Sequence, residues 1–271
     1  MMRELWPFLL ALAGCAPAAP PAPAPAAPRR IVSLDYCADQ YVLKLAPRDR
    51  ILAVSRDAER PTSYMRAAAA GLRRVAARAE DVLVLKPDLV VRSYGGGPGA
   101  AEFLAAAGVP VLQLPYAEDL PGIRAAAIDV AVGLGVPERG RALAAEMDRR
   151  LAALPRRDAG ASALYMTPGG VTAGPGTLVA ELLEAAGLRN FQTEPGWRDL
   201  PLERLAYERP DLVAAASFEG VGSAEPWSAA RHPVARAQLD GPVVGLEGAW
   251  TACGGWFLLD AVEALARRPR P

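Results

Sequence analysis

The chain has 271 residues, of which 52% are hydrophobic and 6% are aromatic. This composition is typical of a soluble globular protein and excludes a disordered one, and the length suffices for two domains of ordinary size. Thirty acidic side chains balance thirty basic ones. The balance argues against a nucleic-acid partner, because electrostatic binding of nucleic acid favours a basic patch and a high pI.

An export signal is predicted at residues 1–15, MMRELWPFLLALAGC. Arg3 supplies a positive start, and an apolar stretch follows at 5–13. That stretch is too short for a permanent spanning helix, which needs about 20 apolar residues. Its end, LAGC, resembles the bacterial lipobox, which predicts lipidation of Cys15. The alternatives are an ordinary cleaved signal or a start assigned too early, because Glu4 is atypical of the charged region.

Alternating Pro and Ala follow at 16–29 and predict a semi-rigid stalk of extended polyproline II. A stalk between a lipid and a folded body suits a protein that is tethered to a membrane and works beside it. Contact with the membrane is then expected only through the lipid anchor.

Short apolar runs alternate with helical segments between residues 30 and 135. The predicted strands are RIVSLDY, RILAVS, LVVRS and GVPVLQL, and the predicted helices lie at 38–45, near Glu80 and at 100–107. Strands that alternate with short helices indicate βαβ units and a mainly parallel sheet. We therefore predict an N-terminal α/β lobe here.

Two consecutive helices are predicted next, with no strand between them. The first contains IRAAAIDVAVGLG, and the second begins at Pro137, which suits a first helical turn, and reads PERGRALAAEMDRRLAALP. Its roughly 19 residues span about 28 Å at 1.5 Å each. We place the connection between the two domains at 136–158.

The alternation resumes at 159–271, which is the predicted C-terminal α/β lobe. In chain order it contains strand SALYM, loop TPGGVTAGPG, helix TLVAELLEAAGL, strands LVAAAS and PVVGL, and a closing helix GGWFLLDAVEALARR. The second half therefore repeats the order of strands and helices predicted for the first half.

One short pattern occurs in both lobes, as EDVLVLKPDLVV and as ERLAYERPDLVA. Glu80 and Glu203 each stand eight residues before the Asp of a Pro-Asp-Leu-Val run. Proline explains by itself why a helix ends there and a buried strand begins. It does not explain a Glu at the same offset in both copies, so the repeat favours two lobes of similar plan.

Cysteine usage is simple once Cys15 carries a lipid. Cys37 and Cys253 remain, an even pair in an exported chain, and a bond between them would join the beginning of the fold to its end. Two thiols that are buried or line a cleft are the alternative to this disulfide.

Taken in order, RIVSLDYCADQ, ILAVS, EDVLVLKPDLVV, GVPVLQL, GWRDLPLERL and RPDLV resemble the substrate-binding proteins of bacterial ABC importers for metal chelates. That class includes vitamin B12-binding and ferric siderophore-binding proteins. The resemblance covers nearly all of the chain from Arg30 to Arg267. It implies two α/β lobes with mainly parallel sheets, a rigid helix between them, for which 137–154 is the candidate, and a ligand cleft between the lobes. It also implies a monomeric periplasmic protein without cofactor that hands its chelate to an ABC permease dimer of the inner membrane.

The resemblance assigns Glu80 and Glu203 to docking, one on each lobe against an Arg pocket of each permease subunit. Charge-assisted contacts with Arg make such a pair physically reasonable. The alternative is two exposed carboxylates that are favoured at helix starts by the macrodipole.

The ligand is expected beyond the carboxyl ends of the strands, as in other open α/β sheets. Aromatic side chains there offer large rigid faces to a planar or bulky ligand. The candidate ligand-binding residues are Tyr36, Arg56, Tyr94, Trp197, Phe218 and Trp250. The resemblance matches Trp197 and Trp250 to aromatic positions of a corrinoid pocket, although loop Trp residues also cap the core of their own lobe. RRVAARA, before Glu80, has no aromatic residue where a B12 binder has one, so a siderophore or another corrinoid stays open.

An enzyme is not predicted. The loop YGGGPG lacks a nucleotide-binding signature, no G-x-S-x-G elbow accompanies the single histidine, and no His/Cys cluster predicts a metal site. His232 is expected in a surface turn, while haem ligation by it or by Tyr36 stays open, as in a haem importer. A ligand-sensing module of a signalling system is a further alternative.

Overall fold

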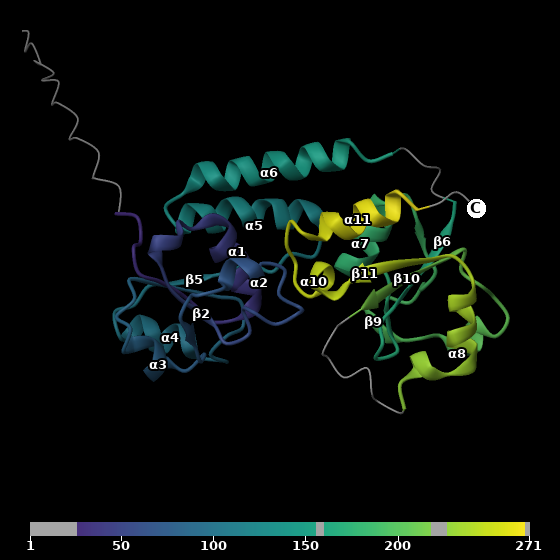
Figure 1. Ribbon diagram of the computed structural model, residues 1–271, viewed down its shortest axis with the longest axis horizontal. Coiled ribbons are helices and arrows are strands. Elements are labelled where there is room, and N and C mark those ends of the chain that lie inside the picture. The colour runs from purple at the N-terminus through teal and green to yellow at the C-terminus, as the bar shows by residue number, and fades with distance from the viewer. Residues whose placement is uncertain (1–25, 156–159, 218–226, 269–271) are drawn as a thin grey trace, which may run out of the picture.

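Each half of the chain builds its own parallel sheet. The computed structural model describes residues 26–155, 160–217 and 227–268, so Cys15, most of the predicted stalk and Phe218 lie outside the described residues. Two α/β lobes lie side by side, and a pair of long helices runs along one side of both (Figure 1). The α/β fold class and the two-lobe plan predicted from the sequence are confirmed.

The N-terminal lobe is a five-stranded sheet with the order β3-β2-β1-β4-β5, and all of its strand pairs are parallel. Its strands are β1 (Ile31–Ser33), β2 (Ile51–Ser55), β3 (Arg74–Val75), β4 (Leu89–Arg92) and β5 (Val111–Gln113). Its helices are α1 (Tyr36–Leu45), α2 (Arg66–Ala69), α3 (Ala79–Leu83) and α4 (Ala100–Ala106), with a 3-10 turn at Arg48–Arg50. β1 and β4 are buried along their whole length, which explains their continuous apolar sequences.

The C-terminal lobe has a four-stranded parallel sheet with the order β11-β10-β6-β8 and a separate antiparallel pair, β7 with β9. Its strands are β6 (Ser162–Met166), β7 (Val171–Ala173), β8 (Arg189–Asn190), β9 (Trp197–Asp199), β10 (Leu212–Ser217) and β11 (Val243–Glu247). Its helices are α7 (Leu178–Ala185), α8 (Leu202–Leu205), α9 (Pro233–Arg236), α10 (Gly248–Thr251) and α11 (Leu258–Ala266), with 3-10 turns at Ala229–Arg231 and Ala237–Asp240.

The Pro-Asp-Leu-Val repeat has the same structural role in both lobes. Asp88 accepts hydrogen bonds from the backbone N–H groups of Arg29 and Arg30, both at 2.8 Å, just before β1. Asp211 accepts from the backbone N–H and the hydroxyl of Ser162, at 2.7 and 2.8 Å, at the start of β6. In each lobe the strand after this Asp pairs in parallel with the strand that the Asp holds. The repeat thus fixes the register of the central strand pair of each sheet.

Two antiparallel helices, α5 (Leu120–Gly133) and α6 (Pro137–Ala152), connect the lobes (Figure 1). Gly140 permits their close packing, because a Cβ there would lie 2.5 Å from the Cβ of Ala131. Near its start α6 is tied to the N-terminal lobe by Arg139, which donates to the carbonyl of Leu45 at 2.8 Å. Near its end Arg150 bonds Glu263 of α11 at 2.7 Å and also pairs with Asp260. The helix is therefore attached to both lobes, and it ends two residues before the predicted 154 because Pro155 disfavours helical geometry in the preceding residue.

One hydrophobic core extends through both lobes. Tyr41 of α1 and Trp256 before α11 are both nearly fully buried in it, with ring centroids 5.4 Å apart. Tyr64 stacks on Phe257 at 4.8 Å. Each lobe adds a smaller cluster on the outer face of its own sheet. A shared core of this kind limits how far the lobes can move apart.

Three predicted loop residues belong to regular elements instead, which corrects the sequence analysis. Trp197 and Thr172 lie in the antiparallel β7–β9 pair, and Trp250 lies in the single-turn helix α10. Elements of three or four residues are too short to show a period in sequence. Among the described residues, no helix is both long enough and apolar enough to cross a membrane.

Candidate functional site

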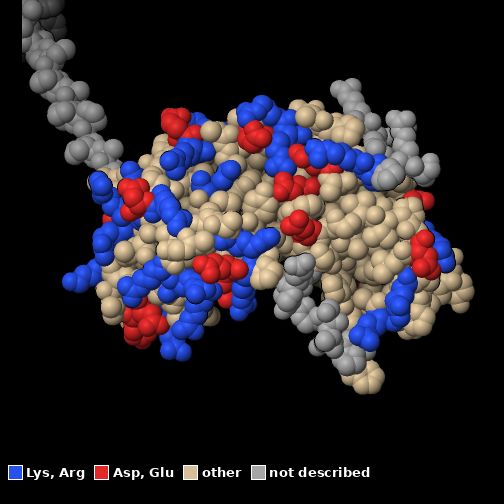
Figure 2. All heavy atoms as spheres, viewed as in Figure 1, with Lys and Arg blue, Asp and Glu red and all other residues tan. Residues whose placement is uncertain are grey.

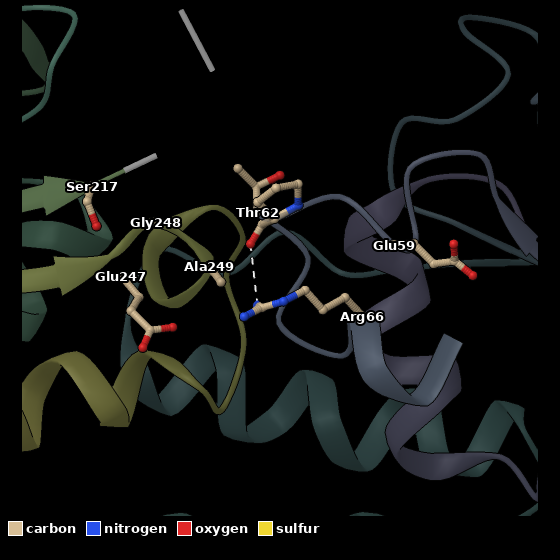
Figure 3. A pocket seen from close by; sticks show the side chains of 8 residues that line it. Glu59, Thr62, Arg66, Ser217, Glu247, Gly248 and Ala249 are labelled. Carbon is tan, nitrogen blue, oxygen red and sulfur yellow. Dashed lines mark hydrogen bonds between the residues drawn. The ribbon is translucent and has the colours of Figure 1, made fainter. Parts of the chain in front are cut away.

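A pocket of about 460 Å³ opens between the lobes, where strands of both sheets end. Residues after β2 and at the ends of β10 and β11 line it, as the carboxyl-end rule predicts. The lining residues are Glu59, Pro61, Thr62, Arg66, Ser217, Glu247, Gly248 and Ala249 (Figure 3). The surface is hollowed between the lobes at the lower edge of the molecule in Figure 2.

The charged groups of this pocket differ in their partners. Glu59 is paired with Arg74 at 3.0 Å and points away from the other side chains drawn in Figure 3. Arg66 extends from α2 into the pocket, and its closest polar contacts are two backbone carbonyl oxygens at 3.4 Å. Glu247, on the opposite wall, forms no ion pair with any described residue. Among the described residues, the pocket therefore presents Arg66 on the N-terminal side and Glu247 on the C-terminal side, each without an ion-pair partner.

Two of the predicted tyrosines lie together beside the cleft. Tyr36 and Tyr94 pack edge to face with ring centroids 6.1 Å apart. Asp35 positions both of them, because it caps α1 through the backbone N–H of Ala38 at 2.9 Å and accepts from the backbone N–H of Tyr94 at 3.1 Å. The same carboxylate also accepts the backbone N–H groups on either side of Tyr94, at 2.7 and 2.9 Å. One buried acid therefore fixes the loop after β4 against the start of α1.

Burial raises the pKa of both tyrosine hydroxyls, and for Tyr94 the negative charge that Tyr36 and Asp35 can carry adds to this effect. Both side chains are consequently neutral phenols near neutral pH, able to donate one hydrogen bond each. Tyr36 donates to the carbonyl of Ala252 in the C-terminal lobe at 3.2 Å, so it crosses from one lobe to the other.

The C-terminal lobe continues this line of aromatic contacts. Thr251, next to Ala252, contacts the hydroxyl of Tyr165 at 3.3 Å, and the Tyr165 ring packs against Trp197 at 6.1 Å. Tyr94, Tyr36, Tyr165 and Trp197 thus belong to one chain of contacts from the N-terminal lobe to the C-terminal lobe, in which Tyr165 is buried. Trp250 is half-buried and packs against the shared core.

Cys37 and Cys253 form a disulfide that joins the first turn of α1 to the segment between α10 and α11. Their Cα atoms are 5.6 Å apart although 216 residues separate them in sequence. The bond crosses from one lobe to the other, next to Tyr36 on one side and close to Trp250 on the other.

The structure brings together only part of the predicted ligand-binding set. Arg56 is exposed and does not line the 460 Å³ pocket, nor do the described aromatic candidates. Arg66 and Glu247 were not predicted. Glu247 ends β11, so the carboxyl-end rule could have found it, whereas nothing in the sequence separates Arg66 from the other arginines of its segment. His232 is exposed and caps α9, where its Nδ1 accepts the Val234 N–H at 3.2 Å.

Glu80 and Glu203 occupy equivalent positions. Each is the second residue of its short helix, α3 or α8, and each is exposed. Neither carboxylate forms a hydrogen bond or ion pair with another described residue. In Figure 1 both helices lie on the side of the molecule away from α6, one at each outer end. The two acids are therefore free to contact a partner that spans both lobes.

Comparison with known proteins assigns the fold to a family. A model of the periplasmic binding protein family matches residues 31–234. The chain belongs to this family. Cobalamin-binding proteins of two Halobacterium salinarum strains are each 30% identical over 196 residues, which is 69% of this chain and 53% of theirs. The chain thus spans about half the length of the curated relatives it matches.

Solved structures share the fold over most of this periplasmic binding protein. The haem-binding protein BhuT, in complex with two haems, is 28% identical with a TM-score of 0.67, and the match covers 88% of this chain and 97% of BhuT. A haem-binding protein from Pseudomonas aeruginosa is 25% identical with a TM-score of 0.65, covering 88% and 91%. The vitamin B12-binding protein BtuF of Vibrio cholerae, 21% identical with a TM-score of 0.62 and coverage of 88% and 95%, shows likeness of fold alone.

Proposed function

We propose that this periplasmic binding protein captures a metal chelate of the corrinoid class in the cleft between its lobes and delivers it to an ABC permease. The observation that carries the proposal is the pocket that places Arg66 and Glu247 on opposite walls, neither of them in an ion pair with another described residue. The cobalamin-binding relatives support the ligand class. On this proposal the protein is a carrier and not an enzyme.

The charges of the pocket favour a corrinoid over haem. Corrinoids carry several neutral amide arms, which can donate to Glu247 and accept from Arg66. Haem carries two carboxylates, and one placed beside Glu247 would meet a like charge at a cost of several kcal/mol. A neutral or cationic ferric hydroxamate would also be tolerated, whereas an anionic siderophore would be repelled.

Delivery to the permease is proposed to use Glu80 and Glu203. Their equivalent helices, their exposure and the lack of a bonding partner among the described residues support this role, since each carboxylate can pair with an Arg of one permease subunit. We further propose that the chain works as a monomer in the periplasm, tethered by a lipid on Cys15, which lies outside the described residues.

Haem is the second candidate, and Tyr36 with Tyr94 favours it. A phenol beside the cleft can become an iron ligand when the metal displaces its proton. The likeness to BhuT is consistent with this candidate. The raised pKa values of both phenols oppose it in the empty site, because deprotonation then costs more.

Titration of intrinsic tryptophan fluorescence with cyanocobalamin, cobinamide, ferrichrome and haemin tests the ligand class. We expect saturable quenching by a corrinoid, reported by Trp197 and Trp250. Glu247→Gln and Arg66→Gln should each weaken that binding about tenfold, because each removes one charge-assisted hydrogen bond.

Arg56→Gln is the matched control, because Arg56 is exposed and lies outside the pocket, and it should leave the affinity unchanged. If haemin alone binds, with an absorption shift that Tyr36→Phe abolishes, then haem is the ligand and the corrinoid assignment is wrong. Quenching by none of the four compounds would remove the chelate class from the proposal.

A further inference from the structure

The disulfide joins the lobes beside the pocket, where Cys253 follows the pocket-lining Ala249 by four residues, and it packs against the edge of the shared core. We call the two segments that it joins, 36–38 and 249–255, the cleft floor. Cys37 and Cys253 are half-buried, whereas Tyr41 and Trp256, a few residues beyond them in each lobe, are nearly fully buried. Tyr36 directly precedes one sulfur-bearing residue, and Trp250 stands three residues before the other. The bond therefore links the two segments that carry aromatic candidates of the ligand site.

A second set of contacts, which we call the aromatic joint, holds the lobes together independently of the disulfide. The Tyr41 ring packs on Trp256 at 5.4 Å, and Tyr64 stacks on Phe257 at 4.8 Å. The hydroxyl of Tyr64 also donates to Asp260 of α11 at 2.7 Å. These contacts belong to the shared core and do not involve either cysteine. Loss of the disulfide would leave this joint in place.

The segment 252–254 has few other attachments. Cys253 also packs against the shared core. Among the described residues, the segment's hydrogen bonds to the N-terminal lobe are two neutral ones, from the hydroxyl of Tyr36 to the carbonyl of Ala252 and from that of Tyr41 to the carbonyl of Gly254, both at 3.2 Å. Within the described part of the chain, the backbone N–H groups of Cys253 and Gly254 donate to no backbone carbonyl. Without the disulfide, the segment would therefore open far more readily than the helices on either side of it.

We propose that the Cys37–Cys253 disulfide is a positioning element of the ligand site. It holds 250–254 against Tyr36 and so fixes the width of the cleft floor before a ligand arrives, while the aromatic joint holds the lobes. When the floor is already ordered, no part of the binding free energy is spent on ordering it as the ligand enters. The expected effect on ligand affinity rests on the proposed function, whereas the expected order of the floor in the ligand-free protein does not.

Hydrogen exchange on the ligand-free, full-length protein tests the floor directly. In Cys37→Ala/Cys253→Ala we expect amides at 36–38 and 249–255 to exchange at least about tenfold faster, while those of α5 and α6 stay within about twofold of wild type. Tyr41→Phe is the matched control. It removes the hydrogen bond to Gly254 but keeps the disulfide, and it should leave exchange at 249–255 within about twofold.

Affinity for cyanocobalamin and cobinamide, measured on the same proteins, tests the consequence. The double variant should bind about tenfold more weakly than wild type at an unchanged circular dichroism spectrum, because the floor must then be ordered on binding. Wild type reduced with a phosphine should behave like the double variant.

Each remaining outcome is decisive. Unchanged exchange at the floor, or equal affinity despite a loosened floor, overturns the positioning role. Accelerated exchange throughout α5 and α6, or loss of the folded spectrum on removal or reduction of the bond, shows that the disulfide holds the whole fold and likewise overturns it. A loosened floor in a protein whose wild type binds neither corrinoid supports the floor and contradicts the proposed function instead.

Discussion

The two lobes share one plan for their scaffold and differ where they face the ligand. In both, an exposed Glu lies in the first turn of a short helix, and an Asp eight residues later accepts hydrogen bonds at the start of the central strand pair. The N-terminal lobe then positions its cleft residues with the buried carboxylate of Asp35. The described part of the C-terminal lobe has no buried carboxylate in this role. Its β7–β9 pair follows a turn between β6 and β7 that the hydroxyl of Thr167 closes.

The surfaces beside Glu80 and Glu203 differ as well. Next to Glu80, a hollow of about 280 Å³ is almost entirely apolar, with Phe103 at its rim. Next to Glu203, a hollow of about 580 Å³ contains Arg198, Asp199 and Arg204. The repeated parts therefore suit a symmetric partner, and the divergent parts suit a ligand and neighbours without symmetry. Variants of matched residues, one in each lobe, test this comparison.

The largest effect is expected at the two exposed glutamates. Glu80→Ala/Glu203→Ala should lower ligand uptake by a reconstituted transporter at least about a hundredfold, since two charge-assisted contacts are lost. Each single change should lower uptake about tenfold and by the same factor in both lobes.

Ligand affinity, measured by fluorescence, should be unchanged in all three variants. Glu102→Ala in α4 and Glu184→Ala in α7, which change an exposed helical acid in each lobe, serve as matched controls and should transport normally. Normal uptake by the double variant would contradict the docking role, and loss through only one of the two sites would contradict the symmetric use of the lobes.

The next effect concerns the residues that hold the cleft loops. Asp35→Ala leaves four backbone N–H groups without their acceptor and removes a helix cap, so it should lower the free energy of unfolding by about 4 kcal/mol. Thr167→Ala, its counterpart after β6, should cost only about 1 kcal/mol. Urea denaturation of both variants measures the difference, and equal costs would show that Asp35 is not the principal support of its loop.

The sequence predicted the scaffold well because its signals are periodic or strongly local. Continuous apolar runs marked the buried strands, and Pro137 marked the start of α6. The shared plan of the lobes was visible as a repeated pattern, although the reason for its Asp emerged only from the hydrogen bonds of Asp88 and Asp211. The β7–β9 pair was missed, because three alternating residues do not distinguish a strand from a loop.

The site was less predictable, because its geometry depends on how the lobes meet. The carboxyl-end rule pointed to the loops after the strands and so to Tyr36 and Tyr94, which do lie together. It does not say which side chain of a ten-residue loop points inward, and so Arg56 was chosen where Arg66 lines the pocket. The pair of cysteines that remains beside Cys15 predicted a disulfide between the beginning and the end of the fold, but not that it lies close to the pocket.

A third comparison concerns two acids four residues after a helix cap, Asp39 in α1 and Glu181 in α7. Burial raises the pKa of Asp39 to about 6 from its ordinary 3.8, although Ser55 donates to it. The folded protein therefore holds a proton that the unfolded chain has released between these values, and stability falls as the pH rises through this window. The free energy of unfolding falls by about 3 kcal/mol across this window, and the whole decrease is present above pH 6.

Asp39→Asn should remove this pH dependence and stabilise the protein at pH 7, because the amide oxygen still accepts the Ser55 N–H. Burial also raises the pKa of the half-buried Glu181, so Glu181→Gln should flatten the profile in the same direction but by less. Urea denaturation at pH 4.5 and 7 measures both. A variant at Asp39 that is less stable than wild type at pH 7 would contradict the assignment.

The smallest effects are expected at the repeated Asp residues, and they test the shared plan most directly. Asp88→Ala and Asp211→Ala each remove an exposed carboxylate that accepts two hydrogen bonds at the start of a central strand. Because water can replace an exposed acceptor, each change should cost about 1–2 kcal/mol, and the two costs should agree within about 0.5 kcal/mol. The sites lie in different sheets, so the double variant should show the sum of the two costs. A clearly larger loss of stability at one site would mean that the two copies of the pattern stabilise their sheets by different means, although they are alike in sequence and in hydrogen bonding.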